Sequence, residues 1–148
     1  MIKIICVGKI KENYFALAIK EYQKRLTKYT KLEIIELPDY NYDEVKTVLE
    51  EGKNILSKIK ENDFVITLDI NGKEMNSVEL SCFIDKNISN NMVFVIGGSY
   101  GLSSEVKQRS NYSLSFSSLT FPHQLFRVIL LEQIYRSFKI INKESYHK

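Results

Sequence analysis

The strongest constraint on the fold is the alternation of short β-branched runs with longer amphipathic segments. Five runs predict strands, at residues 2–7, 32–37, 64–70, 92–96 and 112–116. Apolar residues at helical spacing fill the segments between the first runs, and Ser103 is placed to cap a short helix before the fifth. Strands separated by helices of this length predict a parallel sheet with helices on both faces. Because no linker or low-complexity stretch divides the chain, we expect one α/β domain over residues 1–148.

The last predicted helix, from Pro122 to about Ile141, is apolar around most of its circumference. One face can cover the sheet, but a chain of 148 residues can hardly bury the remainder. We therefore predict a symmetric homodimer formed through this helix. The alternative is a fully internal helix in a monomer.

Composition limits the compartment and the class of partner. No apolar run approaches the roughly 20 residues of a membrane span, and the N-terminal run lacks a signal-peptide cleavage site, so we expect a cytoplasmic protein. Cys6 and Cys82 sit among apolar neighbours and predict small buried side chains. Net charge is +3, and residues 97–148 hold seven basic against three acidic residues. That excess favours an acidic partner, or else reflects a solvated charged face.

Ligands of parallel α/β sheets bind beyond the carboxyl ends of the strands. The segments to consider therefore follow Leu68-Asp69, Ile96 and Phe116. The segment Gly97-Gly98-Ser99-Tyr100-Gly101 lets a ligand approach the backbone. It matches neither G-x-G-x-x-G nor G-x-x-x-x-G-K-[ST], the glycine-rich motifs that bind phosphate groups. The hydroxyl-rich loop around Phe116 either lines a pocket or forms a polar surface.

Hydrolase and metal chemistry are poorly supported. The chain contains no G-x-S-x-G, and its two histidines, His123 and His147, stand apart from any cysteine or carboxylate cluster. Asp69 at a strand end is a candidate acid, but such a residue more often caps a turn.

Several segments together resemble the ribosomal RNA large subunit methyltransferase H family, of the SPOUT class. The resemblance covers the whole chain in order and spacing, and its segments are 68–73, 94–102, 114–128, 132–136 and Tyr146-His147-Lys148. It implies a C-terminal trefoil knot, with knot and donor pocket within about 64–141. It also implies a dimer that transfers a methyl group from S-adenosylmethionine, without a metal, to N3 of a pseudouridine in 23S rRNA of the assembled ribosome.

The resemblance also implies site residues. The donor pocket would comprise Leu68, Gly97, Phe116, Ser117, Ser118, Leu119, Thr120 and Phe121. Tyr146 and His147 are candidates to hold the base or remove its proton; alternatively they belong to a disordered tail. Arg127 and Arg136 are candidates to contact RNA, unless they form structural ion pairs, such as Arg136 with Glu132.

Other functions stay open at this point. The chain could be a non-catalytic ribosome-binding protein, a knotted methyltransferase acting on another RNA, or, least supported, a nucleotide-cofactor enzyme with an atypical glycine loop.

Overall fold

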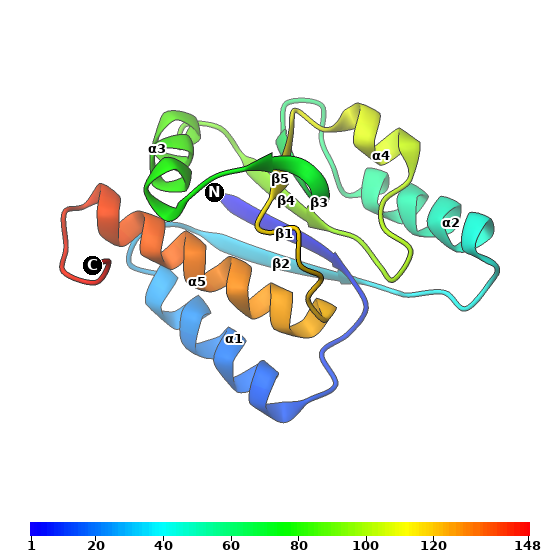
Figure 1. The fold of residues 1–148 in the computed structure, drawn as a ribbon, viewed down its shortest axis with the longest axis horizontal. Helices are drawn as coiled ribbons and strands as arrows, with labels where there is room; N and C mark the ends of the chain where they lie inside the picture. The colour runs from blue at the N-terminus through cyan, green and yellow to red at the C-terminus, as the bar shows by residue number, and fades with distance from the viewer.

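All five predicted strands join one sheet in which every neighbouring pair runs parallel (Figure 1). The computed structural model describes residues 1–148. The sheet order is β2-β1-β4-β3-β5. The strands are β1 (Ile2–Val7), β2 (Leu32–Leu37), β3 (Phe64–Glu74), β4 (Met92–Ile96) and β5 (Tyr112–Ser115). The predicted α/β class with a parallel sheet is confirmed, whereas the trefoil knot stays a prediction.

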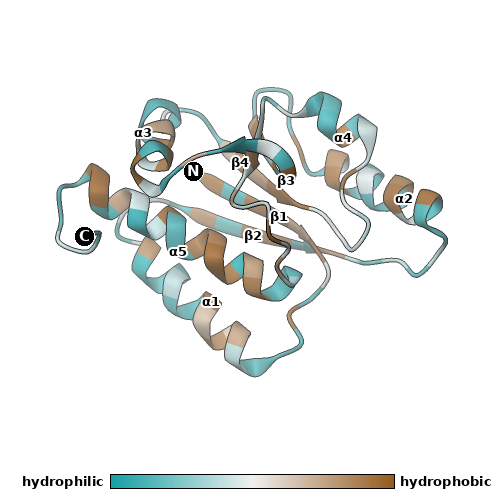
Figure 2. Cartoon of the chain, in the orientation of Figure 1, coloured by the Kyte–Doolittle hydropathy of each residue, from teal (hydrophilic) through white to brown (hydrophobic).

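Helices cover both faces of this sheet. They are α1 (Asn13–Leu26), α2 (Glu44–Ser57), α3 (Ser77–Asn87), α4 (Ser104–Arg109) and α5 (His123–Ile141). The first, third and fifth helices share one face, and α2 and α4 share the other (Figure 1). Strand β4 is buried on both sides, since Phe94 joins the core under α5 while Val93 and Val95 join the core under α2. Figure 2 shows apolar residues concentrated along the strands and along α5. No helix combines the length and apolar character needed to cross a bilayer.

Strand β3 is longer than its sequence pattern predicts. The Asn71-Gly72 pair does not end it, because β3 continues to Glu74 after a register shift in which Leu68 and Lys73 both pair with Leu114. Gly72 makes this possible: a Cβ there would lie 2.8 Å from the backbone of Ser113 and Leu114. The looped-out residues between the two paired stretches lie beside the carboxyl end of β5.

The structure defines the cap of α3 and corrects the prediction for one of the two cysteines. Helix α3 is capped by Asn76, in a capping box with Glu79, because the Asn76 side chain accepts the Glu79 N–H. Cys82 is exposed on α3, whereas Cys6 is buried as predicted, and burial raises the pKa of the Cys6 thiol to about 11.

The C-terminal residues after α5 fold back onto the molecule and are not a detached tail. The Glu144 carboxylate accepts hydrogen bonds from the Tyr29 hydroxyl at 2.8 Å and from Lys28 and Lys139 at 3.1 Å each. The Tyr146 ring packs edge-on against Tyr135 of α5, with centroids 5.0 Å apart. This segment therefore has a defined position beside the C-terminal half of α5 (Figure 1).

Candidate functional site

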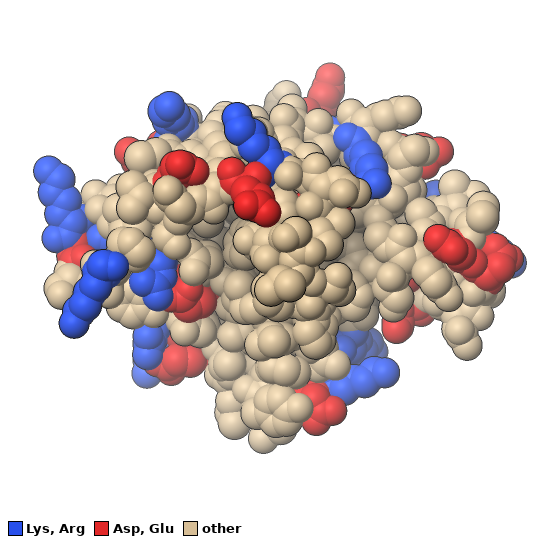
Figure 3. All heavy atoms as spheres, viewed as in Figure 1, with Lys and Arg blue, Asp and Glu red and all other residues tan.

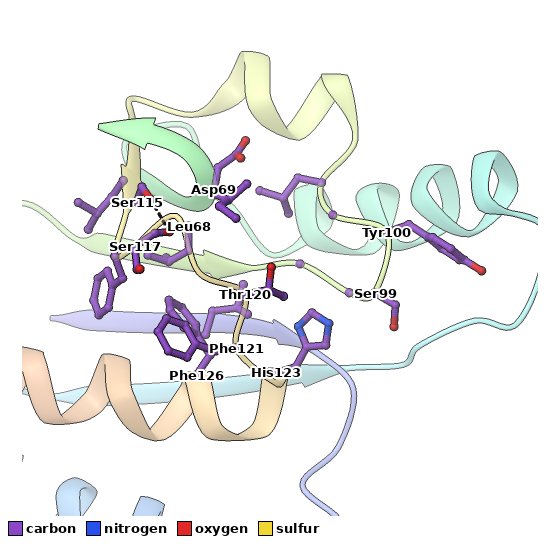
Figure 4. Close-up of a pocket in the computed structure, with 18 of the residues that line it drawn as sticks. Leu68, Asp69, Ser99, Tyr100, Ser115, Ser117, Thr120, Phe121, His123 and Phe126 are labelled. Carbon is purple, nitrogen blue, oxygen red and sulfur yellow. Dashed lines mark hydrogen bonds between the residues drawn. The ribbon is translucent and has the colours of Figure 1, made fainter. Parts of the chain in front are cut away.

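The main cavity lies where sequence analysis expected a ligand, beyond the carboxyl ends of β4 and β5 and beside the register shift of β3. Its volume is about 320 Å³. Seven of the eight predicted donor-pocket residues line it: Leu68, Gly97, Phe116, Ser117, Leu119, Thr120 and Phe121. Ser118 does not line it. Three loops far apart in sequence thus converge on one cavity, which we call the strand-end pocket (Figure 4).

Hydroxyl groups shape the loop between β5 and α5. Ser115 Oγ donates to the Ser117 carbonyl at 3.1 Å, and Ser117 Oγ accepts the Leu119 N–H at 3.0 Å. These bonds hold the loop without regular secondary structure. They also leave Leu119 70% exposed at the pocket edge, where an apolar side chain gains from covering a ligand.

The glycine loop forms the opposite wall. Gly101 has a φ of +83° and its N–H donates to the Gly98 carbonyl at 3.0 Å, which closes a tight turn. A Cβ on Gly97 would come within 2.8 Å of Leu102 Cδ2 and 3.1 Å of the Gly101 backbone. A side chain at residue 97 would therefore displace the turn that lines the pocket.

A group of aromatic rings forms the pocket floor. Phe126, from the first turns of α5, packs against Phe116 at 5.2 Å and Phe121 at 6.0 Å between ring centroids. Figure 4 shows Phe121 and Phe126 next to each other, with His123 at the mouth. Partial desolvation, followed by the nearby charge of Arg127, lowers the pKa of His123. The neutral imidazole is therefore favoured beside these apolar rings.

Asp69 has a structural role at the pocket rim. Its Oδ1 accepts the Asn71 N–H at 3.0 Å, and its Oδ2 lies 3.5 Å from Lys107 Nζ. The turn-capping interpretation of Asp69 is therefore confirmed. The single lysine of the pocket lining is already paired with this carboxylate.

The candidate acceptor-side residues gather in a second cluster, on the C-terminal half of α5. Arg136 donates to Glu132 Oε1 through Nε at 3.0 Å and Nη2 at 2.6 Å, as the ion-pair alternative predicted. Its Nη1 lies 3.0 Å from His147 Nδ1, and the Tyr146 hydroxyl donates to Glu132 at 3.1 Å. Glu132 thus holds Arg136 and Tyr146 together, Arg136 in turn contacts His147, and we call Arg136, Tyr146 and His147 the tail cluster.

Arg127 lies apart from that cluster and is buried. Its side chain is only 3% exposed, and it donates to Glu36 Oε2 at 2.6 Å and to the Gly8 carbonyl at 3.0 Å. The guanidinium therefore has no surface to offer RNA in this structure. The ion pair with Glu36 gives Arg127 a structural role, and its buried position does not fit the expected contact with RNA.

Comparison with known proteins identifies the family. A family described as "Predicted SPOUT methyltransferase" matches residues 1–147. A protein named ribosomal RNA large subunit methyltransferase H, from Clostridium tetani, is 55% identical over 99% of both chains. A protein of the same name from Clostridium botulinum strain Eklund 17B is 56% identical, again over 99% of both. This chain belongs to the SPOUT methyltransferases and, within them, to the ribosomal RNA large subunit methyltransferase H family.

A solved SPOUT-class structure was also matched. The SpoU methyltransferase AviRb from Streptomyces viridochromogenes, in complex with AdoMet, covers 92% of this chain and 57% of its own, with 10% identity and a TM-score of 0.49. At that score the likeness adds nothing to the assignment.

Sequence reasoning missed several pocket residues of this SPOUT methyltransferase. Phe126 and His123 come from the start of α5, where the apolar pattern indicated a helix that covers the sheet and forms a dimer. Their separation of one helical turn from each other, next to the predicted loop, was the available signal. Tyr100 was noticed only as part of the glycine loop, although it is 50% exposed at the pocket edge.

Proposed function

We propose that this chain transfers a methyl group from S-adenosylmethionine to N3 of a pseudouridine in 23S rRNA, acting on the assembled ribosome. It would do so in the cytoplasm as a single knotted SPOUT domain. The observation that carries the proposal is the convergence of the donor residues implied by family resemblance on one cavity. The relatives' name, ribosomal RNA large subunit methyltransferase H, supports the choice of RNA.

The strand-end pocket fits this donor in its chemistry. Leu68, Leu119 and Phe121 offer apolar faces for adenine, and the strand-end backbone offers hydrogen-bonding groups for its edge. Phosphate-bearing cofactors fit worse, because Lys107 is the one lysine or arginine in the lining and Asp69 pairs with it. When bound, the donor would supply an electrophilic methyl group on a sulfonium.

The tail cluster cannot reach that pocket within one chain. Arg136 lies about 20 Å along α5 from His123 at the pocket mouth, at about 1.5 Å per residue. A second subunit removes this difficulty, since two copies of α5 paired about a two-fold axis bring the C-terminal end of one toward the N-terminal end of the other. We therefore include a homodimer in the proposal.

The surface of α5 supports such pairing. Leu125, Val128 and Ile129 follow one another at helical spacing and stay only partly buried in the single chain. On the adjoining helix α1, Tyr14 is 63% and Leu17 57% exposed. Figure 3 shows an uncharged region over the N-terminal part of α5, with charged side chains of both signs around that region. An uncharged surface of this kind favours contact with a protein.

The tail cluster has groups suited to the acceptor base. N3 of the base must lose its proton, and His147 is the candidate to accept it. Tyr146 does not fit that role, because desolvation and the neighbouring Glu132 carboxylate raise its pKa to about 12 and keep the phenol protonated. Tyr146 would instead donate a hydrogen bond. Arg136, with a side chain 25% exposed, is placed to contact the RNA once its pairing with Glu132 or His147 is rearranged.

The experiment is methyl transfer from labelled S-adenosylmethionine to ribosomes from cells that lack the modification. Free 23S rRNA and transfer RNA serve as comparison substrates. Label found as 3-methylpseudouridine in assembled ribosomes alone is the expected result. Label in another RNA would identify a different substrate, and no label from folded dimeric protein would support a non-catalytic ribosome-binding role.

A further inference from the structure

A second cavity adjoins the strand-end pocket on the far side of the glycine loop. It has a volume of about 280 Å³ and is lined by Asp39, Tyr40, Asn41, Thr47, Glu51, Ser99 and Tyr100. Ser99 and Tyr100 line both cavities. Figure 4 shows them at the end of the loop remote from Phe121, with the Tyr100 ring directed away from the phenylalanines. We call this second space the acidic cavity.

Glu51, from α2, is the most unusual residue of the acidic cavity. It is 3% exposed, and its Oε2 accepts the Tyr40 N–H at 3.3 Å. Its Oε1 is buried and has no hydrogen-bond partner. An unpaired buried carboxylate oxygen destabilises the folded chain unless another group satisfies it. Desolvation, the largest effect, raises the pKa of Glu51, as does the charge of Asp39, whereas the Tyr40 N–H lowers it.

The charge of the cavity indicates what that group is. Its lining contains two carboxylates, Asp39 and Glu51, and no lysine, arginine or histidine. Two lysines of the flanking helices α4 and α2 are engaged elsewhere, Lys107 with Asp69 at 3.5 Å and Lys46 over the Tyr42 ring at 4.2 Å. Carboxylates beside tyrosine rings bind cations and repel phosphates. The acidic cavity therefore suits a small cationic group.

We propose that the acidic cavity binds the primary ammonium at the amino-acid end of the methyl donor, with Glu51 and Asp39 as its anionic partners. This inference rests on the proposed function, because it assumes that the nucleoside end occupies the strand-end pocket. Ser99 and Tyr100 line both spaces, so a ligand in the strand-end pocket has the acidic cavity next to it. The Ser99 hydroxyl and the Asn41 amide supply donors for the carboxylate beside the ammonium.

The same arrangement explains the second glycine of the Gly97-Gly98 pair. A Cβ on Gly98 would lie 2.6 Å from Glu51 Oε1. Any side chain at residue 98 would therefore push the carboxylate out of its position beneath the loop. The absence of a side chain at Gly98 therefore lets Glu51 lie directly beneath the glycine loop.

The test compares two ligands by isothermal titration calorimetry on the full-length protein. S-adenosylhomocysteine carries the ammonium, whereas 5′-methylthioadenosine has the same nucleoside thioether without the amino-acid end. We expect Glu51→Gln to weaken S-adenosylhomocysteine about tenfold, as loss of a charge-assisted hydrogen bond does, and to leave 5′-methylthioadenosine within about twofold of wild type. Asp39→Asn, at an exposed position, should act in the same direction. Glu44→Gln, exposed on α2 outside the cavity, is the matched control.

Each other outcome overturns the inference. Equal weakening of both ligands by Glu51→Gln and Asp39→Asn would mean that these residues act through the fold. Unchanged affinities would place the ammonium elsewhere, although the donor assignment would stand. If wild type binds neither ligand, the donor assignment fails first and the inference fails with it.

Discussion

Arg127 on α5 and Glu36 on β2 form an ion pair of 2.6 Å whose two members differ sharply in exposure, 3% against 39%. Arg127 also donates to the Gly8 carbonyl, while its Nε has no partner. The pair thus connects the start of α5 to the ends of β1 and β2. Its stabilising effect depends on keeping the buried guanidinium neutralised.

Glu36→Gln should therefore destabilise the protein, because it leaves a buried positive charge without a counter-ion. We expect a loss of about 3 kcal/mol in the free energy of unfolding. Urea denaturation followed by circular dichroism measures it. Glu33→Gln, at an exposed position on the same strand, should change stability by less than about 0.5 kcal/mol. Equal effects of the two substitutions would show that the ion pair contributes little.

Gly72→Ala tests the close approach of β3 to β5. A Cβ 2.8 Å from the backbone of Ser113 and Leu114 cannot fit, so the second part of β3 must move. We expect a loss of roughly 1–3 kcal/mol in stability, together with weaker binding of S-adenosylhomocysteine. Asn71→Ala, at the exposed neighbouring position, is the control. An unchanged melting temperature for Gly72→Ala would contradict the observed register.

Acid should release the C-terminal segment. The Tyr29 hydroxyl, Lys28 and Lys139 hold the pKa of Glu144 at about 2, below its ordinary 4.5. Because this pKa is depressed in the folded chain, the attachment is fully present above about pH 4.5 and is lost as the pH falls through about 2. Hydrogen exchange of residues 143–147 across this range measures the release.

The matched variant for that experiment is Glu144→Gln, which should raise exchange in the same residues already at neutral pH. Protection unchanged by both acid and the substitution would mean that another contact, such as the Tyr146–Tyr135 packing, holds the segment.

His147→Ala should separate donor binding from methyl transfer. His147 lies in the tail cluster, away from the strand-end pocket of its own chain, so S-adenosylhomocysteine affinity should match wild type. The single-turnover rate of methyl transfer should fall about 10²-fold if the imidazole accepts the proton. Wild-type single-turnover rates would remove His147 from the mechanism.

The fold could be predicted from sequence where periodicity is local and strong. The strand at Met92–Ile96 is apolar throughout because both of its faces are buried. A short apolar run of this kind between turn residues predicts a buried strand of a parallel sheet. The continuation of β3 past Asn71-Gly72 could not be predicted in this way. It depends on a backbone contact between Gly72 and β5. Sequence alone does not distinguish a glycine required by such a contact from a glycine in an ordinary turn.

The candidate site shows the same difference between residues that the sequence indicates and residues whose position depends on packing. Family resemblance pointed to residues of three loops, seven of which line one cavity, whereas no pattern in the sequence indicated the acidic cavity. Glu51 falls within an amphipathic helix, where a glutamate usually marks the solvent face, and only the packing of α2 beneath the glycine loop buries it. The burial of Arg127 could not be predicted for the converse reason, because a basic residue on the last helix is expected at the surface until its partner Glu36 is known.

The central claim is that two subunits together complete one methyltransferase site, the strand-end pocket coming from one and the tail cluster from the other. The direct measurement is methyl transfer to unmodified ribosomes by a purified mixed dimer. One subunit carries Gly97→Val in the donor pocket, and the other carries His147→Ala; Leu119→Arg, at an exposed pocket position, replaces Gly97→Val if that variant folds poorly. Each homodimer of a single variant should be nearly inactive. The mixed dimer retains one pocket facing one intact tail, so we expect it to recover about half of the wild-type rate, since one of two sites is whole. A mixed dimer as inactive as its parents would show that pocket and tail act within one chain and would contradict the shared site.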